Sequence, residues 1–186
     1  MKIRNFSLIA AICDNYGIGV NNKLPWRLKN EMNYFTRITI TSDDESKKNA
    51  VIMGRKTWES IPEKYRPLDG RINLIVSRTV TEKPIKSDGV FSDLKSALVQ
   101  ASCMDEVDQI FIVGGEQIYR EALTFPECST IYLTRIEANF DCDSFFPKFD
   151  EKIFQEISKE TVPKEIQEEN GLKYKFHVYQ RKSIEL

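Results

Sequence analysis

Apolar residues in this chain gather in short, nearly continuous runs, and amphipathic or polar stretches lie between them. Runs of this kind are typical of strands that are covered on both faces of a sheet. They predict buried strands at residues 6–13, 50–53, 71–76, 109–113 and 130–136. The intervening stretches carry apolar residues at helical spacing and predict helices at residues 28–39, 55–61, 92–103 and 116–123.

The C-terminal part of the chain follows a different pattern. Residues 154–158 and 174–180 read as two strands around a charged loop, which predicts an antiparallel addition to the sheet. We therefore expect a doubly wound α/β fold, with a mostly parallel central sheet, helices on both faces and an antiparallel C-terminal strand. No repeat, low-complexity stretch or linker divides the 186 residues, so we expect a single domain spanning residues 1–186. Ser92 is the expected N-cap of the third helix.

Composition and charge exclude several classes of function. Hydrophobic residues make up 41% of the chain and charged residues 30%, which is typical of a globular protein. The net charge of -1 gives no electrostatic footprint for general polyanion binding, so we infer no nucleic-acid partner. The run at residues 6–13 is too short to span a membrane.

Cysteine and histidine usage argues against a metal site. The four cysteines, at positions 13, 103, 128 and 142, form no CxxC pair, and we expect reduced thiols in a cytoplasmic protein. The one histidine, His177, excludes a multi-histidine site and argues against Ser-His-Asp catalysis. We expect His177 to be an exposed strand residue, and we predict no metal ligands.

Three predicted strands end in similar sequences. Their ends are Met-Gly-Arg-Lys-Thr at 53–57, Val-Ser-Arg-Thr at 76–79 and Val-Gly-Gly-Glu-Gln at 113–117. Parallel strands bring their carboxyl ends to one edge of the sheet, and ligands of open α/β sheets bind outside that edge. Glycines, helix N-termini and basic side chains together suit the phosphates of a dinucleotide. The alternative, ordinary turns with solvated basic residues, stays open.

Arg78 bears on which dinucleotide this edge would bind. A guanidinium at such an edge matches a ribose 2'-phosphate, so Arg78 favours NADP over NAD. The usual signatures are absent, because Gly17-Ile-Gly19 is not completed to GxGxxG and no GxxxxGK[ST] motif occurs.

Glu31 is a carboxylic acid on the apolar stripe of the first predicted helix. The other members of that stripe are Leu28, Met32, Phe35 and Ile38. Burying a carboxyl group is costly unless it is paired, hydrogen-bonded or neutral, and desolvation would raise its pKa. We therefore take Glu31 as the candidate acid of an active site. A buried structural glutamate is the alternative.

Short motifs follow one another in a specific order over nearly the whole chain. They are Asn15-Tyr-Gly-Ile-Gly, Leu24-Pro-Trp, Asn30-Glu-Met-Asn-Tyr-Phe, Val51-Ile-Met-Gly-Arg-Lys-Thr-Trp, Ser60-Ile-Pro-Glu-Lys, Arg66-Pro-Leu, Gly70-Arg-Ile-Asn-Leu, Val76-Ser-Arg, Ile112-Val-Gly-Gly, Thr134-Arg-Ile and Phe145-Phe-Pro. In this combination the chain resembles the eukaryotic dihydrofolate reductases.

The resemblance implies an activity and its setting. The family reduces 7,8-dihydrofolate to 5,6,7,8-tetrahydrofolate with NADPH, moving hydride to pterin C6 while N5 is protonated. Its product serves one-carbon metabolism and thymidylate and purine synthesis. The resemblance also implies a cytoplasmic monomer that binds antifolates and has no membrane partner.

The resemblance assigns roles to individual residues. Glu31 would hydrogen-bond the pterin and assist N5 protonation through water, with direct transfer as the less favoured alternative. Trp26 would help to hold that water, and Thr134 would support the acid. The other substrate-binding residues would be Ile9, Met32, Phe35, Ile61, Tyr65, Leu68, Arg71 and Val113. Arg71 would pair with the substrate's α-carboxylate in a bidentate fork.

The resemblance likewise implies an NADPH site with a cis Gly114-Gly115 peptide. Its residues would be Ala11, Ile18, Gly19, Val20, Asn21, Asn22, Lys23, Gly54, Arg55, Lys56, Thr57, Ser77, Arg78, Thr79, Gly114, Gly115, Glu116, Gln117, Ile118 and Tyr119. The loop at 17–23 would move over the nicotinamide, and a static turn is its alternative.

The sequence departs from the family pattern at three places. Arg27-Leu28 replaces two prolines of vertebrate enzymes and is one residue shorter, Met32 replaces Phe or Leu, and Tyr65 replaces Asn. Two other functions stay open: reduction of a related pterin or riboflavin precursor, and non-catalytic nucleotide or folate binding. Arg71 and Phe35 argue against the former, and Glu31 with Trp26 against the latter.

Overall fold

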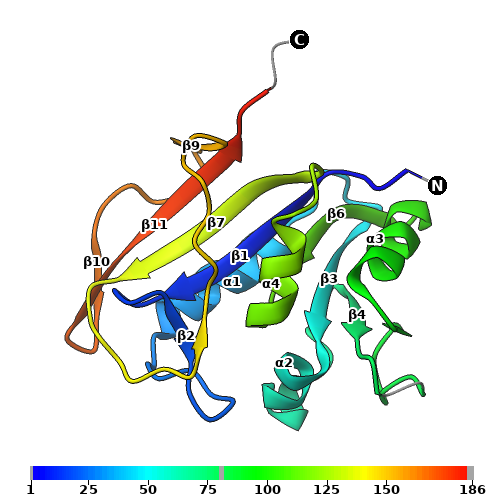
Figure 1. Cartoon of the computed structure of the whole chain (residues 1–186), viewed down its shortest axis with the longest axis horizontal. Coiled ribbons are helices and arrows are strands. Elements are labelled where there is room, and N and C mark those ends of the chain that lie inside the picture. The colour runs from blue at the N-terminus through cyan, green and yellow to red at the C-terminus, as the bar shows by residue number, and fades with distance from the viewer. Residues whose placement is uncertain (1, 80–81, 184–186) are drawn as a thin grey trace.

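The computed structural model describes residues 2–79 and 82–183. A sheet of nine strands lies at the centre of this part of the chain (Figure 1). Its strands are β1 (Phe6–Ile12), β3 (Lys48–Gly54), β4 (Ile72–Val76), β5 (Gly89–Phe91), β6 (Val107–Ile112), β7 (Cys128–Ile136), β9 (Phe154–Ile157), β10 (Gln167–Glu169) and β11 (Leu172–Arg181). Their order is β10-β11-β7-β1-β6-β3-β4-β5, and β9 pairs with β11.

The direction of the strands confirms the predicted fold class. The five pairings among β7, β1, β6, β3, β4 and β5 are parallel. Strand β11 is antiparallel to β7, β9 and β10. The sheet is therefore mostly parallel with an antiparallel C-terminal part, as the sequence pattern predicts.

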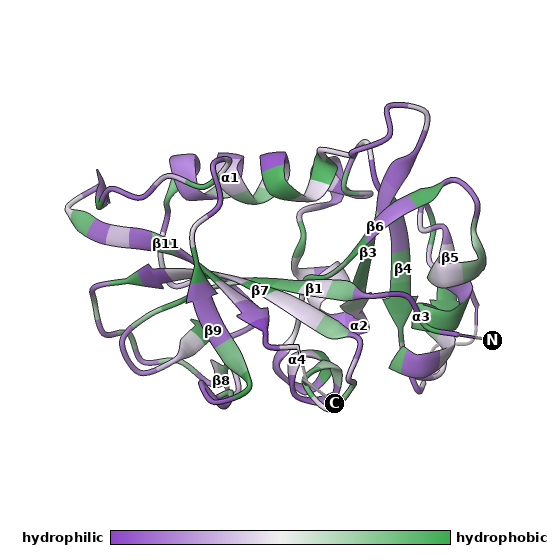
Figure 2. Cartoon of the chain, turned by 90° about the horizontal axis from the view of Figure 1, so that it is seen from above, coloured by the Kyte–Doolittle hydropathy of each residue, from purple (hydrophilic) through white to green (hydrophobic). Residues whose placement is uncertain are grey.

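Helices cover both faces of the sheet. They are α1 (Lys29–Ile40), α2 (Arg55–Ser60), α3 (Leu94–Cys103) and α4 (Glu116–Ala122), with a 3₁₀ turn at Glu63–Tyr65. Helices α1 and α2 contribute to one apolar cluster, and α3 and α4 contribute to another on the opposite side of the sheet. Figure 2 shows α1 on one side of the sheet and α3 and α4 on the other.

The three similar strand ends lie next to one another. Strand β3 pairs in parallel with β6 on one side and β4 on the other, so the ends at Gly54, Val76 and Val113 share one edge. The prediction of a common edge is confirmed. Strands β2 (Gly17–Gly19) and β8 (Ser144–Phe145) form a separate two-stranded sheet.

Two local predictions need correction, and two short strands were not predicted. Asp93, not Ser92, caps α3, because its side chain accepts a hydrogen bond from the backbone of Ser96. The short strands β5 and β10 carry too few residues to give a periodic signal, and the sequence analysis missed both. His177 lies on a strand, but its side chain is only 16% exposed and its Nδ1 lies 2.7 Å from Glu156 Oε1.

The cysteines are free thiols, as predicted. Cys13 and Cys142 come closest, with their sulfur atoms 4.0 Å apart. No helix in the described part of the chain is long and apolar enough to cross a membrane.

We expect Asp93→Ala to lower the free energy of unfolding by about 1 kcal/mol, because it removes the acceptor for the first turn of α3. Ser92→Ala is the matched control, since the hydroxyl of Ser92 donates to the side chain of Asp93 and not to the helix backbone. It should cost less than half as much. Urea denaturation measures both values, and a larger loss in Ser92→Ala would contradict this assignment of the cap.

Candidate active site

Glu31 lies in the first turn of α1 and is only 6% exposed. The hydroxyl of Thr134, on β7, donates a hydrogen bond of 2.9 Å to Glu31 Oε1. Burial raises the pKa of Glu31 to about 7, with the hydrogen bond from Thr134 opposing this rise and the nearby charge of Glu169 adding to it. The acid can therefore exist in both protonation states near neutral pH.

The buried face of α1 differs from the predicted stripe. Glu31, Tyr34 and Ile38 are buried, whereas Met32 is 43% exposed. Residues separated by three, four or seven positions share a helix face, and Met32 is rotated by about 100° from Glu31. The prediction that Met32 points inward is wrong. Tyr34, which the stripe omitted, stacks on Phe176 of β11 with ring centroids 3.8 Å apart.

Apolar side chains that sequence analysis assigned to the substrate come together on the α1 side of the sheet. Ile9 and Trp26 are buried in this cluster. Its partly buried members include Phe35, Ile61, Leu68 and Val113. Trp26 Nε1 is buried and donates no hydrogen bond to any part of the described chain. A buried donor of this kind suits a bound water.

Arg71 immediately precedes β4 and is 8% exposed. It donates from Nη1 to Thr39 Oγ1 at 2.8 Å and from Nε to the carbonyl of Asp69 at 3.0 Å. Desolvation lowers its pKa. The charge of Asp69 opposes this effect. Within residues 2–79 and 82–183 Arg71 forms no ion pair, so a ligand carboxylate would give this largely buried charge a direct partner. Tyr65 is exposed, with Lys64 Nζ 4.7 Å above its ring.

Strand β1 links this cluster to the opposite face of the sheet. Tyr119, on α4, is buried and donates a hydrogen bond of 2.6 Å to the carbonyl of Ile9. The Gly114–Gly115 peptide is cis, as the resemblance implies. The backbone N–H of Gly54 donates to the carbonyl of Gly114 at 2.8 Å, which joins the ends of β3 and β6.

Glycine is required where these two strand ends meet. A Cβ on Gly115 would lie 3.2 Å from the hydroxyl of Thr57, and Gly114 has a φ of 124°, which L side chains rarely adopt. The backbone of these two strand ends is therefore closely packed.

The charged residues of the edge differ in their partners. Arg55 pairs with Glu59 at 2.8 Å, whereas Lys56 is exposed. Arg78 is exposed, and its Nη2 lies 3.4 Å from Gln117 Oε1. This contact joins the segment that follows β4 to α4, the helix that follows β6.

Among the predicted cofactor residues, Glu116 is engaged by the protein itself. Its carboxylate accepts hydrogen bonds from Arg120 and from the backbone of Phe145, both at 2.9 Å. Ser77 and Ile118 are buried, Thr79 is exposed, and Ala11 is partly buried beside the apolar cluster.

The loop that was predicted to cover the cofactor lies beside the same edge. Val20 and Lys23 form a bridge, and Asn21 and Asn22 between them have φ values of 49° and 59°. The N–H of Asn21 donates to Asp143 at 2.8 Å. A pocket of about 530 Å³ lies between this loop and α2, the helix that follows β3. Its lining residues are Asn21, Asn22, Arg55, Lys56, Glu59, Asp143 and Ser144.

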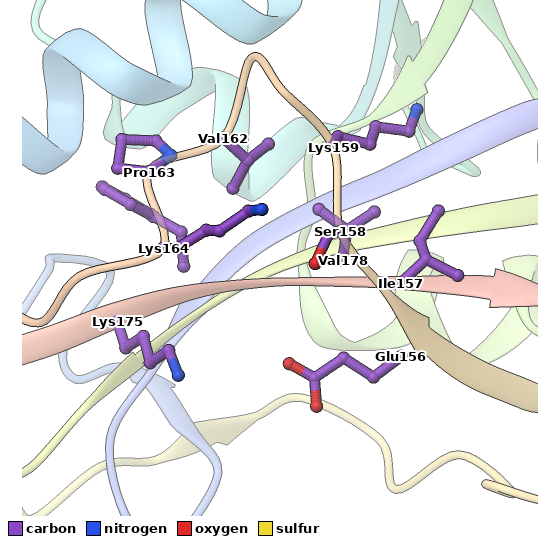
Figure 3. A pocket seen from close by; sticks show the side chains of 10 residues that line it. Glu156, Ile157, Ser158, Lys159, Val162, Pro163, Lys164, Lys175 and Val178 are labelled. Atoms are coloured by element: carbon purple, nitrogen blue, oxygen red, sulfur yellow. The ribbon is translucent and has the colours of Figure 1, made fainter.

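A second pocket, of about 200 Å³, lies between β11 and the segment that follows β9 (Figure 3). It is lined by lysines 159, 164 and 175 and by apolar side chains such as Val162 and Val178. None of the residues that the sequence analysis assigned to a site lines it.

Comparison with known proteins shows to which family this chain belongs. A sequence model described as dihydrofolate reductase matches residues 5–181. The chain belongs to the dihydrofolate reductase family. It is 46% identical over 178 residues to the dihydrofolate reductase of Heliothis virescens, covering 94% of this chain and 96% of the relative. It is 45% identical over 184 residues to that of Sus scrofa, covering 96% and 99%.

A solved structure gives the same result for the fold. The chain superposes on Schistosoma mansoni dihydrofolate reductase with a TM-score of 0.84 and 36% identity, covering 97% of this chain and 100% of that one. Membership of the dihydrofolate reductase family confirms the resemblance and identifies the chain as an enzyme, an oxidoreductase.

The sequence did not indicate two acids that hydrogen-bond to segments of the dihydrofolate reductase site from distant parts of the chain. Glu169 accepts hydrogen bonds from the first turn of α1, and Asp143 accepts one from the loop at Asn21. Both acids lie more than 120 positions from their partners in sequence. No periodicity or local motif carries such a signal.

We expect Glu31→Gln to change how stability depends on pH. The unfolded chain releases this proton near pH 4.5, whereas the folded chain keeps it until about pH 7. Between these values the folded state binds more protons, so this group makes wild-type stability fall as pH rises. Glutamine does not titrate. The unfolding free energy of the variant relative to wild type should therefore rise by about 3 kcal/mol across this range.

Urea denaturation at several pH values measures the difference. Thr134→Val serves as a second variant, because losing the hydrogen bond that lowers the pKa of Glu31 should move the upper end of the range to higher pH. A difference between Glu31→Gln and wild type that stays constant from pH 4.5 to 7 would contradict a raised pKa.

Proposed function

We propose that this enzyme reduces 7,8-dihydrofolate to 5,6,7,8-tetrahydrofolate with NADPH. The observation that carries the proposal is the placement of Glu31. This acid is buried, is hydrogen-bonded to Thr134 and has a pKa raised to about 7. It lies beside an apolar cluster on one face of the sheet and near Tyr119 of the other face.

Glu31 would orient the pterin and assist its protonation. A carboxylate oxygen can accept hydrogen bonds from the ring's N–H groups, and a pKa near 7 suits proton transfer at neutral pH. The proton would reach N5 through a water held by Trp26 Nε1, a buried donor that is otherwise unused in the described chain. Phe35 and Val113 would pack against the rings and exclude bulk water.

Arg71 would select the tail of the substrate. Its guanidinium is fixed by Thr39 and the carbonyl of Asp69. A fixed, buried guanidinium without an ion pair suits bidentate binding of a carboxylate. This favours a substrate with a glutamate tail over a pterin that lacks one.

The sheet edge has the groups that NADPH requires. When bound, NADPH supplies the hydride for the reduction. The backbone around Gly54 and Gly115 would lie against the cofactor, and Lys56 and Arg78 would neutralise phosphates. The Asn21–Asn22 turn faces the same edge across the 530 Å³ pocket and would limit access of water to the nicotinamide.

We expect purified protein to oxidise NADPH when dihydrofolate is added and methotrexate to block the reaction. Glu31→Gln should lower the hydride-transfer rate about 100-fold at neutral pH, because the variant cannot supply or relay the proton. The loss should be smaller at low pH, where solvent protonates N5. Stopped-flow absorbance measures these rates, and a small, pH-independent loss would contradict the role of Glu31.

We expect Arg78→Ala to reduce the preference for NADPH over NADH by about 10-fold or more, since Arg78 would pair with the 2'-phosphate that NADH lacks. The measurement is kcat/KM for each cofactor. NADH is the internal control, because its value should change little. An unchanged ratio would contradict the assignment.

A further inference from the structure

The first turn of α1 receives its cap from a distant part of the chain. Leu28 occupies the N-cap position and offers no side-chain acceptor to the first N–H groups of the helix. Glu169, at the end of β10, supplies acceptors for two of these N–H groups. Its Oε1 accepts from Lys29 N at 2.7 Å, and its Oε2 accepts from Asn30 N at 2.9 Å.

The hairpin that carries Glu169 has a defined two-residue turn, and this turn contacts the segment before α1. Asn170 and Gly171 form the two-residue turn between β10 and β11, with φ values of 51° and 74°. The side chain of Asn170 donates 2.7 Å to the carbonyl of Arg27. Three hydrogen bonds thus tie this turn to the segment that leads into Glu31.

The same hairpin is continuous with the strand pair that holds the acid directly. On β11, Phe176 is paired with Thr134 of β7, whose hydroxyl donates to Glu31. Two residues of the same sheet therefore position Glu31. Glu169 binds the backbone of the helix that carries it, and Thr134 binds its carboxyl group.

Four titratable groups from four elements interact with Glu31. They are Tyr34 of its own helix, Tyr119 of α4, Tyr174 of β11 and Glu169 of β10. Burial raises the pKa of each tyrosine above its ordinary value, so these three are neutral near pH 7. Among the four, Glu169 is the group whose charge raises the pKa of Glu31.

We propose that Glu169 is a positioning residue for the reaction. Its carboxylate fixes the first turn of α1, and its negative charge offsets the positive end of that helix beside Glu31. Without this charge, the helix end would favour the ionised form of Glu31. The acid would then hold its proton less well at neutral pH. The effect on catalysis rests on the proposed function, whereas the effect on the titration of Glu31 does not.

Carbon-13 NMR of glutamate-labelled protein tests the titration without any substrate. The Glu31 carboxyl signal is assigned by its loss in Glu31→Gln. Glu169→Gln should lower the midpoint of this signal by roughly half a pH unit, the size expected of one charge at a helix end. Glu169→Asp keeps the charge at greater distance and should give an intermediate value.

Glu168→Gln is the matched control. Glu168 is the exposed neighbour on β10 and points to the opposite face of the strand. It should leave the midpoint unchanged. Equal midpoints in Glu169→Gln and Glu168→Gln, or a rise in Glu169→Gln, would overturn the proposal. If Glu169→Gln does not fold, Glu169→Asp provides the test. A midpoint in that variant at or above the wild-type value would overturn the proposal.

The pH profile of hydride transfer gives the second readout. Glu169→Gln should shift the profile to lower pH by the same amount as the NMR midpoint, which is about a threefold loss in rate above the midpoint. A loss in rate without a shift of the profile would mark a merely structural role and overturn the proposal. Wild-type protein that does not reduce dihydrofolate would refute the proposed function, and the NMR titration would still decide the role of Glu169.

Discussion

The hydrogen bond between Thr134 and Glu31 is the contact on which the site depends. It joins a helix to the centre of the sheet and gives a buried carboxyl group its direct side-chain partner. Its geometry follows from strand register, because β7 places Thr134 opposite Ala11 of β1 and opposite Phe176 of β11. A shift of one residue in this register would turn the hydroxyl away from the acid. The chemistry of the site is therefore fixed by backbone pairing across three strands.

Strand β1 serves both halves of the site because successive side chains on a strand point to opposite faces. Ile9 belongs to the apolar cluster on the α1 side, whereas Leu8 and Ala10 pack against the cluster on the α4 side. The carbonyl of Ile9 accepts the hydrogen bond from Tyr119. One strand therefore contributes side chains to both apolar clusters.

The raised pKa of Glu31 reflects a balance between opposing effects. Burial favours the neutral acid, and the hydroxyl of Thr134 favours the carboxylate. A helix N-terminus by itself would also favour the carboxylate, but the charge of Glu169 lies at that terminus and acts in the opposite direction. The acid therefore titrates in the range where proton transfer at neutral pH is effective.

The sequence by itself determined the longer strands of the central sheet, the fold class and the shared edge at Gly54, Val76 and Val113. These features depend on local apolar runs and on the geometry of parallel sheets, which are readable from neighbouring residues. It also singled out Glu31 as an acid on an apolar stripe. The family resemblance added the expected roles of Trp26, Thr134 and the individual binding residues, which no local pattern carries.

Only the tertiary structure decided how the acid is held and which side of α1 faces inward. The rotation of a helix is set by what it packs against, so Tyr34 lies inside and Met32 outside. The cap of α1 comes from Glu169, about 140 positions away, because a helix N–H can be satisfied by any acceptor that folding brings near it. Such contacts form between residues that folding brings close in space. The periodicity of a sequence predicts which side of a segment is buried, but it does not predict which distant residue the segment contacts.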